Sequence, residues 1–160
     1  MKLFKLFLIL STLGSLPHCG TASEDEKEKT VSYFEIGQGL LAEGRTPEAI
    51  EYLQLAHERD SQNAHYAMIL GVALSQVKQY SQSISLLNEA LKLKSPNPDA
   101  WNNLAAVYLK MNDPQKALAA ADESLKIATY KTPDFAWAHK AQAYLKLGKL
   151  NQAFQAADAG

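Results

Sequence analysis

Apolar residues recur along most of the chain at the three- and four-residue spacing of helices that bury one face. The clearest runs are Ile50, Leu53 and Ala56, followed by Leu86, Leu87, Ala90 and Leu91. No stretch of alternating apolar and polar residues, rich in β-branched side chains, is long enough to form a sheet. The pattern therefore predicts an all-α protein.

Short signals for turns and helix starts separate these runs. Gly44 and Gly148 are expected in tight turns that need a positive φ, which glycine adopts readily. The expected N-caps and first-turn prolines after such turns are Thr46-Pro47, Ser81 and Asp113-Pro114. Prolines expected to break the chain between helix pairs are Pro96, Pro98 and Pro133. The helices are thus predicted to form consecutive hairpins.

The hairpins repeat with a period of 34 residues. Matching positions are Tyr33, Ile36, Gly37 and Leu40; Ala67, Leu70, Gly71 and Leu74; and Trp101, Leu104, Ala105 and Tyr108. A fourth copy follows at an offset of 36, at Trp137, Lys140, Ala141 and Tyr144. The copies span about 30–63, 64–97, 98–131 and 134–160, which gives one repeat domain over residues 30–160.

Three positions in every copy carry only glycine, alanine or serine. They are Gly37, Ala49 and Ala56; Gly71, Ser83 and Ala90; Ala105, Ala117 and Ser124; and Ala141, Ala153 and Gly160. We expect small side chains at these positions because the two helices of a hairpin approach closely there.

This register resembles the tetratricopeptide repeat (TPR), whose pattern is W-x₂-L-G-x₂-Y, then A-x₃-F, then A and P. The closest matches are Trp101, Leu104, Tyr108, Ala117 and Pro133. Departures are Ala67 in place of the aromatic residue and Lys140 in place of the apolar one. The resemblance implies a solenoid of helical hairpins with about three and a half repeats, because the last copy stops inside its second helix.

The resemblance also implies a binding groove on the concave face, formed by the first helix of each copy. The candidate groove residues are Phe34, Gln38, Leu41, His65, Met68, Val72, Asn102, Leu109, Phe135, Gln142 and Leu145. An extended peptide or an amphipathic helix of a partner protein is the expected ligand. The alternative is that several of these side chains only pack between neighbouring first helices. The cationic clamp of co-chaperone TPR domains is absent in either register of the copies.

The N-terminus has the layout of a bacterial secretion signal. Lys2 and Lys5 precede the apolar stretch Leu6–Leu10, which is too short for a transmembrane helix. The segment that follows, Leu16-Pro17-His18-Cys19-Gly20, resembles the lipobox of bacterial lipoproteins, although His18 replaces the usual small residue. Residues 1–18 are therefore predicted to be a lipoprotein signal peptide, and Cys19 the site of lipid attachment, including palmitate. The alternative is an ordinary secretory signal with an incidental cysteine.

Residues 19–29 join this signal to the repeats. The charged run at 24–29 is compatible with a solvated tether or with an early start of the first helix, for which Ser23 and Glu26 would form a capping box. Residues 20–63 carry 4 basic and 10 acidic residues, a net −6, whereas residues 64–160 carry 10 basic and 7 acidic residues, a net +3. An acidic end next to the anchor is expected to keep the solenoid away from anionic lipid.

Composition excludes several classes of activity. The net charge is −1 with only two arginines, which argues against nucleic-acid binding. No phosphate loop, GxSxG or HExxH motif is present, and His57, His65 and His139 are too scattered for a metal site. We therefore expect no enzyme activity, no metal and no cofactor.

The predicted function is that of a membrane-anchored TPR lipoprotein acting as a protein-interaction scaffold or adaptor in the bacterial cell envelope. It would lie on the periplasmic or surface side, with the outer membrane favoured, as a monomer or weak dimer. Two alternatives stay open: a pilotin-like assembly accessory of a secretion or pilus machine, and a regulatory subunit of a cell-wall enzyme. At the C-terminal end, Phe154 is expected to pack inward, and Leu145 and Leu147 to stay partly uncovered.

Overall fold

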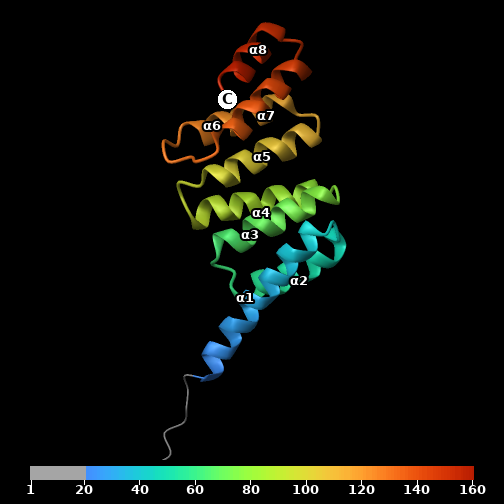
Figure 1. The fold of residues 1–160 in the computed structure, drawn as a ribbon, viewed down its shortest axis with the longest axis vertical. Helices are drawn as coiled ribbons and strands as arrows, with labels where there is room; N and C mark the ends of the chain where they lie inside the picture. The colour runs from blue at the N-terminus through green and yellow to red at the C-terminus, as the bar shows by residue number, and fades with distance from the viewer. Residues whose placement is uncertain (1–20) are drawn as a thin grey trace, which may run out of the picture.

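The computed structural model describes residues 21–160, which form helices joined by short turns and contain no strand. The helices are α1 (Thr21–Ala42), α2 (Thr46–Arg59), α3 (Ala64–Gln76), α4 (Tyr80–Leu93), α5 (Pro98–Lys110), α6 (Pro114–Leu125), α7 (Pro133–Lys146) and α8 (Leu150–Asp158). They pair as four antiparallel hairpins that stack along the long axis of the molecule (Figure 1). The predicted all-α solenoid of helical hairpins is confirmed.

The turn inside each hairpin uses one residue with a positive φ at the same repeat position. These residues are Gly44, Lys78, Asn112 and Gly148, with φ of 77°, 64°, 61° and 72°. The sequence indicated the two glycines but not Lys78 or Asn112, because side-chain identity does not reveal a left-handed conformation at a non-glycine residue. All four turns lie along one edge of the solenoid (Figure 1).

The helix caps follow a different pattern from the predicted one. Asp113 caps α6 as expected, since its carboxylate accepts from the backbone N–H of Lys116 at 3.1 Å. Thr46 and Ser81 lie inside α2 and α4, so their predicted capping roles are wrong. The side-chain caps at the starts of α3 and α5 are instead Asn63 and Asn97, which occupy equivalent positions of successive repeats.

Small residues lie where the helices of each hairpin meet. All the predicted small positions are buried except two in the last copy, Ala141 and Gly160. A Cβ atom added to Gly71 would lie 3.1 Å from Cγ of Leu87 and 3.2 Å from the backbone oxygen of Ser83. Leu87 is completely buried beneath α3, so the close approach at Gly71 is what allows α3 and α4 to pack together.

Helix α1 extends beyond the first hairpin at its N-terminal end. The sequence left open whether the charged run at 24–29 is a solvated tether or an early start of the first helix. Residues 21–29 are helical, so the run is part of the first helix. Ser23 lies inside this helix, and the predicted capping box therefore does not mark its start. The Glu26 carboxylate pairs with Arg59 of α2 and with Lys29, 3.1 Å away, which fixes the extension to the first hairpin.

The last helix is short and thinly covered. Helix α8 has 9 residues, and Phe154 is 68% exposed, so the prediction that it packs inward is wrong. Its counterparts Ile50 and Ile84 pack into clusters that include residues of the following hairpin, whereas no helix among residues 21–160 lies beyond α8. Whether the side chain at this repeat position is buried therefore depends on the presence of a following hairpin and not on the type of residue.

We expect residues 150–160 to exchange their amide hydrogens fastest within the four hairpins, because α8 buries mainly alanine and gains little apolar contact. Hydrogen–deuterium exchange on a dilute sample measures this directly. Slow exchange of α8 in a sample shown to be monomeric would contradict the expectation.

Candidate functional site

The candidate groove residues divide into an accessible set and a buried pair. The accessible ones, which we call the groove face, are Gln38, Leu41, His65, Met68, Val72, Asn102, Phe135, Gln142 and Leu145, each exposed or half-buried on α1, α3, α5 or α7. Phe135 and Leu145 are the most exposed apolar members, at 60% and 55%. These side chains are placed where a ligand lying across the first helices could touch them.

Phe34 and Leu109 are not part of this surface. Phe34 is 7% exposed, and its ring centroid lies 4.4 Å from that of Tyr66 and 5.1 Å from that of His65. Leu109 is 6% exposed and packs with Ala117 and Ala143. Both side chains pack between neighbouring hairpins, and Leu109 reaches the surface only as part of the lining of the cavity between α5 and α7.

A cavity of about 270 Å³ opens in the surface of the first helices between α5 and α7. It is lined by Ala106, Leu109, Lys110, His139, Gln142 and Lys146, all of which lie on these two helices. Of this lining, only Leu109 and Gln142 were among the groove residues predicted from the sequence. The sequence feature that could have indicated this cavity is the pair Lys110 and Lys146, which occupy the same repeat position at an offset of 36 residues.

Polar bonds between successive hairpins build the walls of this cavity. Lys110 Nζ donates to Ser75 Oγ at 3.2 Å, and Lys146 Nζ donates to Asn112 Oδ1 at 2.9 Å. His139 Nδ1 and Asn102 Oδ1 are 2.9 Å apart. Burial lowers the pKa of His139, so its imidazole is neutral at pH 7. The cavity therefore combines two ammonium groups with uncharged polar side chains.

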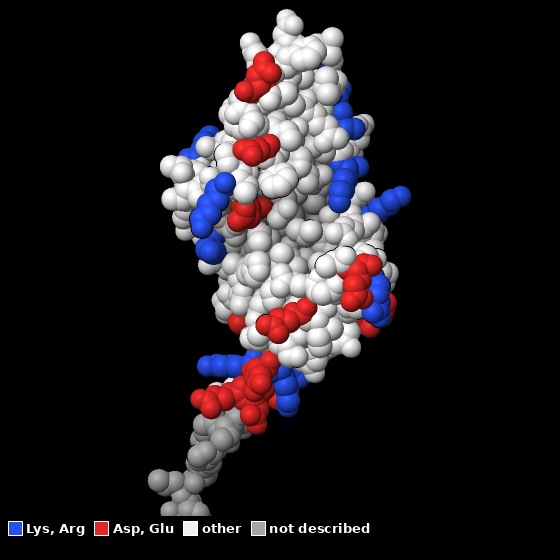
Figure 2. Space-filling view, in the orientation of Figure 1, with Lys and Arg blue, Asp and Glu red and all other residues white. Residues whose placement is uncertain are grey.

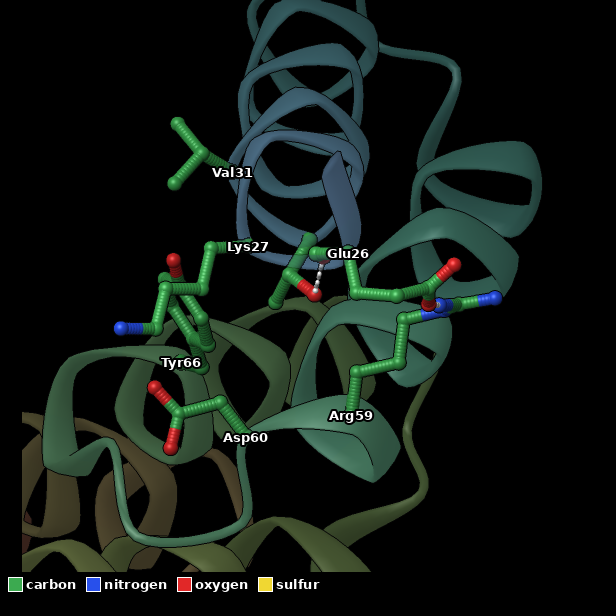
Figure 3. A pocket seen from close by; sticks show the side chains of 7 residues that line it. Glu26, Lys27, Val31, Arg59, Asp60 and Tyr66 are labelled. Atoms are coloured by element: carbon green, nitrogen blue, oxygen red, sulfur yellow. Dashed lines mark hydrogen bonds and ion pairs between the residues drawn. The ribbon is translucent and has the colours of Figure 1, made fainter. Parts of the chain in front are cut away.

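A larger cavity of about 550 Å³ lies at the N-terminal end, between α1, the end of α2 and the start of α3. Figure 3 shows Glu26 and Arg59 facing each other on one side of it, with Lys27, Asp60 and Tyr66 on the other. Hydrogen bonds from Lys29 and then Arg59 hold the pKa of Glu26 below its usual range. The Glu26–Arg59 ion pair beside this cavity links the α1 extension to the end of α2.

Charged side chains are unevenly distributed over the molecule. Figure 2 shows charged residues crowded around the α1 extension at the foot of the molecule, and basic residues along the edges of the upper hairpins. The lysines at or beside the turns of the second, third and fourth hairpins are Lys78, Lys110, Lys116, Lys146 and Lys149. Among the ion pairs of the described residues, only Lys116 of this set has a carboxylate partner, Asp113 at 3.0 Å.

Within residues 21–160 no three His, Cys, Asp or Glu side chains come together as they would around a metal ion. No helix in the same range has the length and apolar character needed to cross a bilayer. Cys19, the predicted lipid site, and the predicted signal peptide lie outside the described residues.

Comparison with known proteins identifies the repeat. A family model for the anaphase-promoting complex, cyclosome, subunit 3 matches residues 42–124, and a tetratricopeptide repeat model matches residues 136–158. Tetratricopeptide repeat protein 36 of Caenorhabditis elegans is 39% identical over 62 residues, which cover 39% of this chain and 35% of that protein. The chain thus spans about a third of the length of the first curated relatives that it matches.

Solved structures of similar fold share little sequence with the chain. The MamA protein superposes with a TM-score of 0.71 at 24% identity, covering 84% of this chain and 73% of MamA. The pilF protein of Pseudomonas aeruginosa gives 0.76 at 21% identity, covering 84% of this chain and 61% of pilF. PilW, described as a widely conserved type IV pilus biogenesis factor, gives 0.75 at 18% identity, covering 81% of this chain and 60% of PilW.

These likenesses establish the fold, and the family models establish the repeat. The four stacked hairpins, the 34-residue register and the buried small positions agree with both. The fold is that of a protein-interaction scaffold, in which binding surfaces are built from successive repeats. The chain belongs to the tetratricopeptide repeat family.

Proposed function

We propose that this chain is a membrane-anchored scaffold of the bacterial cell envelope, whose groove face binds a segment of a partner protein. The observation that carries the proposal is the groove face itself. It presents exposed apolar side chains, such as Phe135 and Leu145, beside polar ones such as Gln142, next to a cavity lined only by first helices. Mixed surfaces of this kind suit an extended peptide or an amphipathic helix.

The anchoring part of the proposal rests on the N-terminal sequence together with the start of α1. Cys19 follows a short apolar stretch in a segment that resembles a lipobox, and the chain is helical from the first described residue, Thr21. A lipid on Cys19 would therefore lead directly into a helix. The nine residues 21–29 would extend roughly 13 Å at the rise of an α-helix.

The charge of this extension supports a position away from the lipid surface. Glu24, Asp25, Glu26 and Glu28 outnumber Lys27 and Lys29, so the end nearest the proposed anchor is acidic. Anionic headgroups repel such a segment. The solenoid would then project from the membrane with its groove face free for a partner.

A second candidate function is that of an accessory factor for the assembly of a pilus or secretion machine. It is favoured by the similarity in fold to pilF and to PilW, a type IV pilus biogenesis factor. The two candidates share the same groove and the same anchor, and they differ only in the partner.

Capture of the partner tests the proposal. The full chain is expressed with an affinity tag after Gly160, proteins are crosslinked in intact cells, and the membrane fraction is purified for mass spectrometry. A reproducible envelope protein, lost from the Cys19→Ala variant when it is no longer at the membrane, supports the scaffold. Subunits of a pilus or secretion system favour the second candidate, and recovery of no envelope protein contradicts both.

A further inference from the structure

The cavity between α5 and α7 carries more positive charge than the rest of the groove face. Lys110 and Lys146 occupy the same repeat position on successive first helices, whereas the preceding copies have Ala42 and Gln76 there. The positive charge is therefore confined to the C-terminal half of the groove.

Neutral partners hold both ammonium groups at the cavity. Lys110 bonds to the Ser75 hydroxyl and Lys146 to the Asn112 amide oxygen, and neither lysine is within ion-pair distance of a carboxylate among the described residues. The cavity lining contains no acidic residue. Two cations beside a hollow, without a negative partner of their own, are a surface complementary to a negatively charged ligand.

We propose that this cavity binds acidic side chains of an extended segment of the partner protein, with one carboxylate at Lys110 and a second at Lys146. The inference rests on the proposed function and names the chemistry of its ligand. Adjacent packed helices lie roughly 8–10 Å apart, and an extended chain advances about 3.3 Å per residue. Two acidic residues about three positions apart therefore match the two lysines.

The surroundings of the lysines define the rest of the segment. Ala106 and Leu109 line the same cavity, so an apolar side chain between the acidic ones would find apolar contacts there. His139 and Gln142 offer uncharged polar groups to the backbone of the segment. The preferred ligand is an acidic and apolar segment, and a basic one is repelled.

Two peptide probes test this inference on the chain from residue 20 onward. One is the fluorescent eight-residue peptide Ser-Glu-Leu-Ala-Glu-Leu-Ser-Gly with an amidated C-terminus, and the other has Gln in place of both Glu. Affinity is measured by fluorescence anisotropy for wild type, Lys110→Gln, Lys146→Gln, the double variant and the control Lys92→Gln, an exposed lysine on the second helix α4.

The acidic peptide is expected to bind wild type about tenfold more tightly than the Gln peptide, with each lysine contributing about threefold. The double variant should bind both peptides equally, Lys92→Gln should match wild type, and Lys110→Glu with Lys146→Glu should prefer a peptide with Lys in place of Glu. Circular dichroism confirms that the variants keep their helicity.

Equal binding of the two peptides to wild type, an unchanged preference in the double variant, or no binding of either peptide would overturn the inference. These results leave the proposed scaffold function untested, because that function is tested separately by capture of the partner from cells.

Discussion

Replacing Cys19 by alanine is expected to abolish retention of the chain in the membrane fraction and to leave the unprocessed precursor. The cysteine sulfur is the only thiol in the sequence, so no other residue can accept a thioether-linked lipid. Each buried CH₂ of an acyl chain contributes about 0.8 kcal/mol to membrane binding, and two chains give stable anchoring. Removal of the attachment site therefore removes the contribution of the acyl chains to membrane binding.

Detergent phase partitioning of cell extracts measures the effect, with and without globomycin to block cleavage of the signal peptide. His18→Ala is the matched control, because it keeps the cysteine and supplies the small residue usual before it. His18→Ala should partition like wild type, with processing at least as complete. A Cys19→Ala chain that still partitions into detergent would show that the anchor is not a lipid on this residue.

Replacing Gly71 by leucine is expected to lower the free energy of unfolding by about 1–3 kcal/mol, the usual cost of overpacking a well-packed interior. The new side chain would meet Leu87, which is completely buried, and the backbone oxygen of Ser83, which cannot move without shifting α4. Urea denaturation followed by circular dichroism at 222 nm gives the change in stability.

Gly39→Leu is the control for the same substitution at an open position. Gly39 is exposed in α1, and nothing lies within 4 Å of a Cβ atom added there. Leucine has a higher helix propensity than glycine, so this variant should gain about 0.5–1 kcal/mol. If Gly71→Leu is as stable as wild type, the assigned register of the hairpin is wrong.

The repeat register made the hairpins predictable because it combines several independent signals. The repeat placed Gly71 and Ser83 among the positions of close helix approach, and in the structure a Cβ atom added to Gly71 would lie 3.2 Å from the backbone oxygen of Ser83. The caps were harder to predict. The caps Asn63 and Asn97 occupy equivalent repeat positions. Serine and threonine are also preferred N-cap residues, so residue type alone did not distinguish the true caps from Thr46 and Ser81.

The groove could be predicted only in part, because exposure depends on the neighbouring hairpin. Phe34 and Met68 occupy equivalent repeat positions, yet Phe34 is buried against Tyr66 of the next hairpin, while Met68 is half-buried. Phe154 differs from Ile84 for the same reason. A sequence pattern predicts on which face of a helix a residue lies. Whether that face is buried depends on the hairpins packed against it.

The central claim is that the partner binds to the groove face, and position-specific photo-crosslinking in intact cells tests it most directly. A photoreactive amino acid is placed singly at Val72 or Gln142 on the first helices, and at Lys92 or Lys126 on the outer side of the hairpins. The same partner band is expected from Val72 and Gln142 and is expected to be absent from Lys92 and Lys126. A partner band from Lys92 and Lys126 alone would contradict the account, because it would place the binding surface at the second helices α4 and α6 and the ends of these helices.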